Sequence, residues 1–309
     1  MHSDRKRVKT KGERIAAILF TAVFSFGGAV TLGSGTTAAE ILISGGIAIV
    51  LLMSVSLSSG RILSFAEGGI LYRAVWSIVA VAALLFGAMS VVNISDYASR
   101  VIVAGTPVLL LRIIFISLCA YLGYIGPMAI RKIGVVVAFL TVTLALVLLA
   151  MSAPSFRWGN ISEMAGEGVQ TGGILSAFGA LFAPCVVGIM LMSADPEGGP
   201  MPTTSCALLG GGVSVLFALL CLLNVVLVLG GRTMYQYPYS TAVSTVTAGK
   251  LFARLEGFVY FMLYACEAVK GAAGIALAVR MTKLISPALH KRGCCVCAAA
   301  ALILLLSYM

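Results

Sequence analysis

Charged residues and histidines are both scarce in this sequence. Only 10% of its 309 residues are charged, against about 25% in a typical soluble domain. Hydrophobic residues make up 60%, which is roughly 185 residues and enough for about nine membrane spans of ~20 residues each. The chain is therefore predicted to be an all-α, multi-pass membrane protein with little length left for a soluble domain.

The scarcity of histidine excludes most catalytic sites. His2 and His290 are the only two, so neither a Ser-His-Asp triad nor an HExxH zinc site can be assembled. The pair Gly249-Lys250 is followed by Leu251 and lacks the earlier glycine of a phosphate-binding loop. No nucleophile and base are available within the apolar spans. We therefore expect neither an enzyme nor a cofactor.

The cysteines do not indicate a metal site either. Five of the eight are scattered singly in apolar segments, where free cysteine behaves as a small hydrophobic residue. The segment HKRGCCVC offers four nominal ligands, but its adjacent cysteines match no usual zinc spacing. The nominal ligands are His290, Cys294, Cys295 and Cys297. We expect no bound metal.

The net charge of +10 indicates membrane topology rather than nucleic-acid binding. Residues 1–14 form a basic tail with six of the 21 Lys and Arg. With this tail in the cytoplasm, 14 basic residues lie on the inner side and five on the outer side, as the positive-inside rule requires. The apolar runs predict spans at about 15–36, 38–60, 70–95, 107–126, 130–151, 172–193, 205–230, 254–280 and 293–309. We expect one membrane domain at 15–309, with repeats at about 15–151 and 170–309.

Two of these spans are unusually rich in glycine. Span 1 contains FGGAVTLGSGTTAAE, and span 6 contains GGILSAFGALFAPCVVGIM. Glycine and proline permit local unwinding, and interrupted helices at equivalent places in two halves indicate a midplane binding site in inverted-repeat transporters. Close packing of small residues is the alternative. The candidate ligand-binding residues here are Gly27, Gly28, Thr31, Gly33, Ser34, Ser176, Gly179 and Pro184.

Polar residues inside other spans are further candidates. Glu267 and Lys270 lie three residues apart near the middle of span 8, where a charge costs roughly 2.5 to 3.5 kcal/mol. They are either a structural ion pair or a charge that couples transport to a cation or proton. Asn93 could contact a polar ligand or form a bond between helices. Arg112 lies near the outer end of span 4, where its stem can snorkel to the interface.

Several segments together resemble the spore-germination permeases, the B subunits of bacterial germinant receptors in the amino acid-polyamine-organocation superfamily. TPVLLLRIIFISLCAYLGYIGPMAIRKIGVVVAF is similar to the fourth span and following loop of that family. YQYPYSTAVSTVTAGKLFARLEGFVYFMLYACEAVKG is similar to its aromatic-proline stretch and its Arg-Leu-Glu start of span 8. The residues that match are Thr106, Pro107, Arg131, Pro238, Arg254 and Glu256.

This resemblance implies a leucine-transporter-like helical bundle of two inverted repeats, with ten spans as the family norm against about nine here. It also implies a small ligand, often an amino acid, between spans 1, 3, 6 and 8. A-type and C-type receptor subunits would be the partners, in a spore inner membrane.

The leading hypothesis from the sequence is a germinant-receptor-type permease homologue that binds a small nutrient, foremost an amino acid. Free N–H groups of the interrupted helices would hold its carboxylate. A proton-coupled amino acid transporter and a membrane scaffold subunit with a vestigial pocket are the alternatives.

Overall fold

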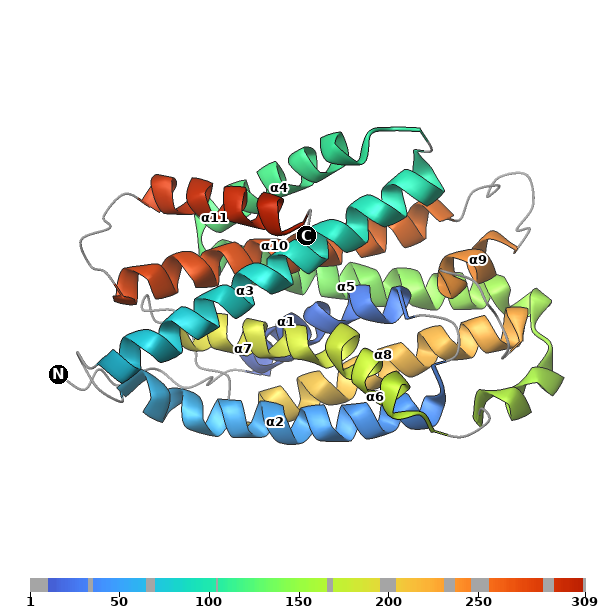
Figure 1. Cartoon of the computed structure of the whole chain (residues 1–309). Helices are drawn as coiled ribbons and strands as arrows, with labels where there is room; N and C mark the ends of the chain where they lie inside the picture. The colour runs from blue at the N-terminus through green and yellow to red at the C-terminus, as the bar shows by residue number, and fades with distance from the viewer. Residues whose placement is uncertain are drawn as a thin grey trace.

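The computed structural model describes residues 11–32, 36–64, 70–103, 105–165, 169–194, 204–230, 237–245, 256–285 and 292–307. Within these residues the secondary structure is helical throughout (Figure 1). The α-helices are α1 (Lys11–Val30), α2 (Ala38–Ser64), α3 (Ile70–Tyr97), α4 (Val108–Ile125), α5 (Pro127–Ser152), α6 (Thr171–Ala177), α7 (Ala183–Ala194), α8 (Thr204–Leu229), α9 (Pro238–Ser244), α10 (Glu256–Ile285) and α11 (Arg292–Leu306). Two π-helical turns, η1 (Ala98–Ile102) and η4 (Phe178–Phe182), and two 3₁₀ segments, η2 (Ala153–Ser155) and η3 (Trp158–Ala165), complete the described elements.

Eight of the predicted spans are helical segments long and apolar enough to cross a membrane. The third differs most from its predicted limits, because α3 continues through η1 to Ile102 instead of ending near residue 95. The ninth, α11, has 15 residues and is about 22 Å long at 1.5 Å per residue, shorter than a hydrocarbon core of about 30 Å. The prediction of an all-α, multi-pass membrane protein is confirmed. The repeat boundaries stay a prediction.

Helix α10 lies at the centre of the bundle. Of the 18 residues in its most apolar window, 89% are buried, the highest share among the eight spans described. It packs against α1, α3, α4, α5 and α7, and α3 crosses in front of it in Figure 1. A side chain on Gly274 would approach the carbonyl oxygen of Ala83 to 2.6 Å, so the small residue allows this close crossing.

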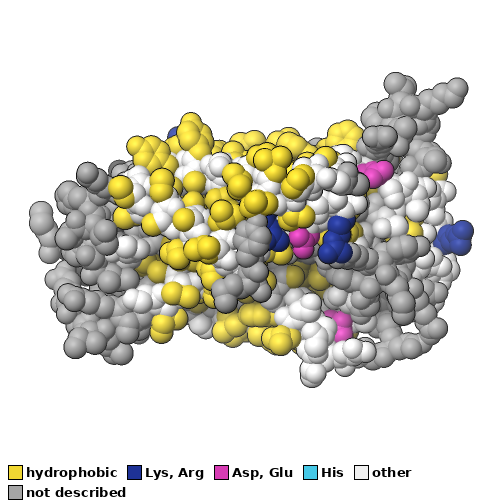
Figure 2. Space-filling view, turned by 45° about the horizontal axis from the view of Figure 1, so that its top comes forward, with side chains coloured by type: hydrophobic (Ala, Val, Ile, Leu, Met, Phe, Trp, Pro, Cys, Tyr) yellow, Lys and Arg dark blue, Asp and Glu magenta, His cyan; other side chains and the backbone are white. Residues whose placement is uncertain are grey.

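The outside of the bundle is apolar, as lipid contact requires. Hydrophobic side chains cover much of the described surface at the left and centre of Figure 2, and charged side chains are few on that face. Exposed large residues occur on α4, α5 and α11, for example Leu110, Phe139 and Leu305. These side chains would face acyl chains, so their exposure needs no soluble partner.

The connection between α4 and α5 is a single residue. Gly126 has a φ of +117°, which L side chains rarely adopt. Pro127 follows at the first position of α5, where its missing N–H costs no helical hydrogen bond. The Gly-Pro pair thus reverses the chain in the shortest possible space and holds the two helices together at this end.

Candidate functional site

Glu267 and Lys270 form an ion pair in the middle of α10. The Nζ of Lys270 donates to Oε1 of Glu267 at 2.7 Å. The Glu267 side chain is 1% exposed and the Lys270 side chain is 7% exposed. The second carboxylate oxygen, Oε2, is buried and has no hydrogen-bond partner in the described part of the chain. A buried charge is stabilised only when its remaining lone pairs are also satisfied, so this pair is incomplete as a purely structural feature.

A small cavity adjoins this ion pair. Its volume is about 30 Å³. A cavity needs roughly 10 to 15 Å³ to hold a single water. The cavity therefore has room for one or two waters, and a ligand the size of an amino acid requires it to widen. The lining residues come from α1, α3, η4, α7 and α10, and they are Phe24, Phe86, Met89, Ser90, Asn93, Gly179, Ala180, Pro184, Val187, Glu267 and Lys270.

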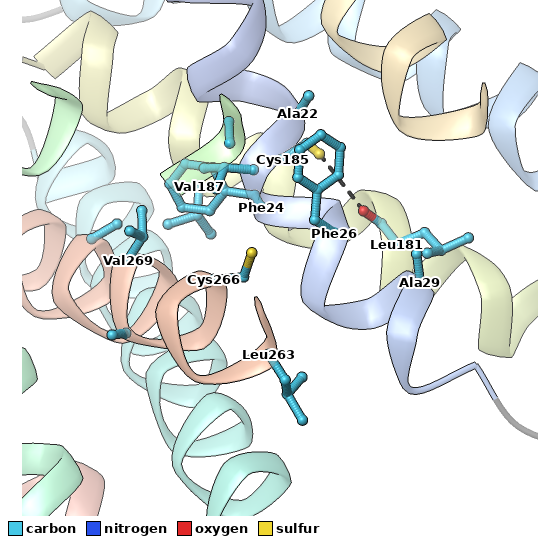
Figure 3. Packing of buried hydrophobic residues seen from close by; sticks show 14 of the residues in the cluster. Ala22, Phe24, Phe26, Ala29, Leu181, Cys185, Val187, Leu263, Cys266 and Val269 are labelled. Atoms are coloured by element: carbon cyan, nitrogen blue, oxygen red, sulfur yellow. Dashed lines mark hydrogen bonds between the residues drawn. The ribbon is translucent and has the colours of Figure 1, made fainter. Parts of the chain in front are cut away.

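The end of α1 closes one side of this site. A side chain on Gly27 would collide with the Glu267 carboxylate, and one on Gly28 would collide with the carbonyl of Ala180. Figure 3 shows Phe24, Phe26 and Ala29 on the same helix among residues of α7, η4 and α10. The two glycines therefore let α1 approach the ion pair and η4 more closely than any other residue would.

The predicted unwinding of span 1 is wrong at these two glycines. Both belong to the regular helix α1, which ends at Val30. The Thr31 hydroxyl then lies 3.2 Å from the carbonyl oxygens of Gly27 and Gly28 and donates to them. These carbonyls are thus satisfied locally and are not free for a ligand. Gly33 and Ser34 lie outside the described residues.

The interruption of span 6 is a π-helical turn. Pro184 has no N–H and cannot donate to the carbonyl of Ala180 four residues earlier. The turn η4 fills the position between α6 and α7, and such turns are frequent at functional sites. The prediction of an unwound segment is therefore wrong, although the proline does mark the irregularity.

The other predicted ligand-binding residues divide between the cavity and its surroundings. Asn93, Gly179 and Pro184 line the cavity. No hydrogen bond joins the Asn93 side chain to another described residue, so the alternative of a bond between helices is not found. Ser176 is exposed on α6, and neither it nor Thr31 lines the cavity.

Sequence reasoning missed Glu40, a buried carboxylate at the start of α2. Its Oε2 accepts from the backbone N–H of Thr37 at 2.9 Å, while the Thr37 hydroxyl accepts from the N–H of Glu40. Its Oε1 accepts from the backbone N–H of Gln170 at 2.8 Å. The spacing Thr37-x-x-Glu40 is the capping-box pattern and could have been found. Glu40 thus joins the first turn of α2 to the start of α6.

Arg112 is held by several neighbours between α3, α4 and α11. Its Nε donates to the Ser95 hydroxyl at 3.3 Å, and its Nη1 donates to the carbonyl of Ser307 at 2.6 Å. Its Nη2 lies 3.7 Å from the Asp96 carboxylate, and the side chain is 12% exposed. The snorkelling interpretation is wrong, because the guanidinium binds three neighbours inside the protein.

The residues that match the germination permeases begin or flank helices. Thr106 lies in the turn before α4, and Pro107 caps that helix. Arg131 lies in the second turn of α5. Pro238 and Glu256 are the first residues of α9 and α10, and Arg254 lies outside the described residues. Their roles stay predictions.

Comparison with known proteins identifies the fold. No family model matches the chain, and no curated protein matches it. Mhp1, a nucleobase-cation-symport-1 family transporter in a closed conformation with bromovinylhydantoin bound, matches with a TM-score of 0.65 and 17% identity, over 99% of this chain and 74% of its own. The fold is leucine-transporter-like.

Two further structures agree with this assignment. MhsT in complex with L-phenylalanine matches with a TM-score of 0.62 and 14% identity, over 98% of this chain and 80% of its own. Mhp1 in an inward-facing conformation matches with a TM-score of 0.61 and 16% identity, over 99% and 74%. At these identities the leucine-transporter-like fold is what the comparison establishes.

Proposed function

We propose that the chain is a transporter-type permease that binds a net-neutral zwitterion, foremost an amino acid with an uncharged side chain, at Glu267 and Lys270. The observation that carries this proposal is the unpartnered Oε2 of Glu267 beside a cavity. The fold supports it, since Mhp1 and MhsT were solved with bromovinylhydantoin and L-phenylalanine, respectively. Mhp1 is a transporter.

The chemistry of the ion pair selects the charge of the ligand. Lys270 offers N–H groups that its single bond to Glu267 leaves over, and Glu267 offers an acceptor. A ligand carboxylate would accept from Lys270, and a ligand ammonium would donate to Oε2. A ligand of net charge would leave one charge uncompensated, at a cost of about several kcal/mol in a buried site. Side chains would thus take the role that the sequence suggested for free backbone groups.

Binding requires the cavity to widen. Phe24 of α1 lines it, and Gly27 and Gly28 bring the same helix close to the Glu267 carboxylate and the Ala180 carbonyl. Separation of α1 from η4 would enlarge the site without breaking the helical hydrogen bonds of α10. The same separation would expose the pair to one side of the membrane, which is the movement that a permease needs.

The test measures equilibrium binding of labelled L-alanine, L-leucine and L-phenylalanine to the purified protein, with L-lysine and L-aspartate as charged comparators. We expect the neutral amino acids to bind and the charged ones to bind at least tenfold more weakly. The double variant Glu267→Gln/Lys270→Met keeps the site neutral and should weaken binding about 10- to 100-fold, the equivalent of one or more charge-assisted hydrogen bonds.

The matched control is Ser176→Ala, which changes an exposed residue of α6 outside the cavity. It should bind like the wild type. Equal binding by the folded double variant, or no binding of any neutral amino acid, would refute the proposal.

A finer proposal concerns what binding accomplishes. The sequence resemblance supports a germinant-receptor B subunit with its N-terminus in the cytoplasm, which signals to A-type and C-type subunits in a spore inner membrane. Co-purification of such subunits and amino-acid-dependent germination would support this role.

The transporter alternative uses the same site. Proteoliposome uptake of labelled amino acid that depends on a pH gradient and on Lys270 would favour proton-coupled transport. The scaffold alternative would be favoured if partners co-purified while no neutral amino acid bound.

A further inference from the structure

A second, larger cavity lies away from the ion pair, between α3, α4 and α10. Its volume is about 160 Å³, and it shares no lining residue with the cavity beside Glu267 and Lys270. Tyr264 and Tyr260 of α10 line it, three and seven residues before Glu267. At 1.5 Å per residue they lie about 5 and 10 Å from Glu267 along the helix axis.

Three aromatic rings form one wall of this cavity. The rings of Phe115 and Tyr264 meet edge to face with centroids 5.2 Å apart. Those of Tyr260 and Tyr264 are tilted at 5.6 Å, and Tyr260 also stacks on Tyr97 at 6.2 Å. Each ring is thus held by a neighbour, and the wall is prearranged for contact with a further ring at its edges or face.

The cavity also contains unused hydrogen-bonding groups. No hydrogen bond joins the hydroxyl of Tyr260 or Tyr264 to another residue in the part of the chain that the structure describes. By contrast, the neighbouring Tyr97 hydroxyl donates to Ser240 at 2.8 Å. Tyrosines inside a protein normally find a polar partner. Both side chains are partly exposed, so their hydroxyls are available to a molecule within the cavity or at its mouth.

The cavity is open toward the membrane side of α4. Ile114 lines it and is 54% exposed, on a helix whose outer residues are apolar. A guest would therefore enter from the bilayer, and it must itself be soluble in lipid. The volume is close to the roughly 150 Å³ of an engineered apolar cavity that binds benzene.

From these observations we propose that the cavity binds a compact aromatic molecule carrying one hydroxyl or N–H group, of the size of a phenol. Its ring packs against Phe115, Tyr260 and Tyr264, and its polar group bonds to a tyrosine hydroxyl. This site is independent of the proposed function, because it uses neither Glu267 nor Lys270. A lipid acyl chain is the competing occupant, and it would leave both hydroxyls without a partner.

Fluorine NMR of para-fluorophenol added to the full-length protein in nanodiscs tests the proposal, with fluorobenzene as the apolar comparator. We expect saturable broadening with para-fluorophenol, and at least tenfold tighter binding than for fluorobenzene. Ile114→Trp should fill the mouth and abolish this binding. Ile113→Trp changes the neighbouring residue, which is 44% exposed and outside the lining, and should leave it intact.

Two further variants separate the contributions of shape and hydrogen bonding. Tyr260→Phe/Tyr264→Phe should reduce para-fluorophenol binding to the level of fluorobenzene without altering the fluorobenzene signal. Ala98 of η1 lines the cavity, so Ala98→Val provides a second filling variant if Ile114→Trp does not fold. The proposal is overturned if the folded filling variants bind as the wild type does, or if oleate displaces para-fluorophenol while phenol does not.

Discussion

Charged side chains inside the described part of the bundle occur in two kinds of surroundings. Glu40 and Arg112 are bonded by neighbours from other elements, and both are held through more than one atom. Within the part of the chain that the structure describes, the Glu267 and Lys270 side chains bond only to each other, and one carboxylate oxygen has no partner. The charges held by several neighbours join helices, whereas the pair with an unpartnered oxygen adjoins a cavity. This difference separates a structural charge from a candidate for ligand binding.

The largest effect is expected when one member of the incomplete pair is removed. Lys270→Met leaves the Glu267 carboxylate buried without a counter-charge and should lower the free energy of unfolding by about 3 to 5 kcal/mol. Chemical denaturation in detergent measures this. The double variant Glu267→Gln/Lys270→Met should recover most of the loss. If it were as unstable as the single variant, the pair would be structurally essential rather than held ready for a ligand.

Removal of the Glu40 carboxylate should cost slightly less. Glu40→Ala leaves the backbone N–H groups of Thr37 and Gln170 without their acceptor, so the free energy of unfolding should fall by about 2 to 4 kcal/mol. Hydrogen exchange at these two amides should accelerate as well. Gln170→Ala is the matched control, because the backbone of Gln170 makes the bond, and its effect should stay within about 0.5 kcal/mol. If the two variants had equal effects, the Glu40 carboxylate would not be a structural charge.

A methyl group at Gly27 should disturb the ion pair by contact alone. Gly27→Ala collides with the Glu267 carboxylate and should destabilise by about 1 to 3 kcal/mol through overpacking. Gly172→Ala, which meets nothing within 4 Å on α6, should instead stabilise by about 0.5 to 1 kcal/mol. Thermal unfolding of both variants checks the difference in sign. A stabilising Gly27→Ala would contradict the close approach of α1 to the pair.

The smallest effect is expected for a conservative change at Arg112. Arg112→Lys keeps the charge but cannot bond to Ser95, Asp96 and Ser307 in the same geometry. The expected loss is about 1 to 2 kcal/mol, measured in the same unfolding experiment. Arg112→Met should cost more, since Asp96 would lose its positive neighbour. If lysine and methionine were equivalent, the guanidinium geometry would be irrelevant.

The architecture of this chain was predictable because it follows from composition. Long apolar runs can satisfy their backbone in a bilayer only as helices, so eight spans and the central place of Glu267 and Lys270 could be inferred. Pro184 also marked an irregular turn. The neighbours of each helix could not be inferred, and they decide the rest. Gly27 and Gly28 are helical and pack closely against a carboxylate and a carbonyl, which no local pattern reveals.

The missed and misread charges have the same origin. Glu40 lies at the beginning of a span, where an acidic residue usually faces water, and the capping box beside it was overlooked. The depth of Arg112 in its span predicts that its stem reaches water at the interface. Its partners Ser95 and Ser307 lie far from it in the sequence, and only the packing of α11 against α4 brings Ser307 within reach.

The one-residue connection at Gly126 has a mechanical consequence for the aromatic cavity. Helices α4 and α5 cannot separate where this glycine joins them, and near its other end α4 is tied to α3 and α11 through Arg112. Leu111, Ile114 and Phe115 lie beside this second attachment. A guest arriving from the lipid would therefore enter past side chains such as Ile114, with both ends of α4 held in place and α5 packed on α1 and α10.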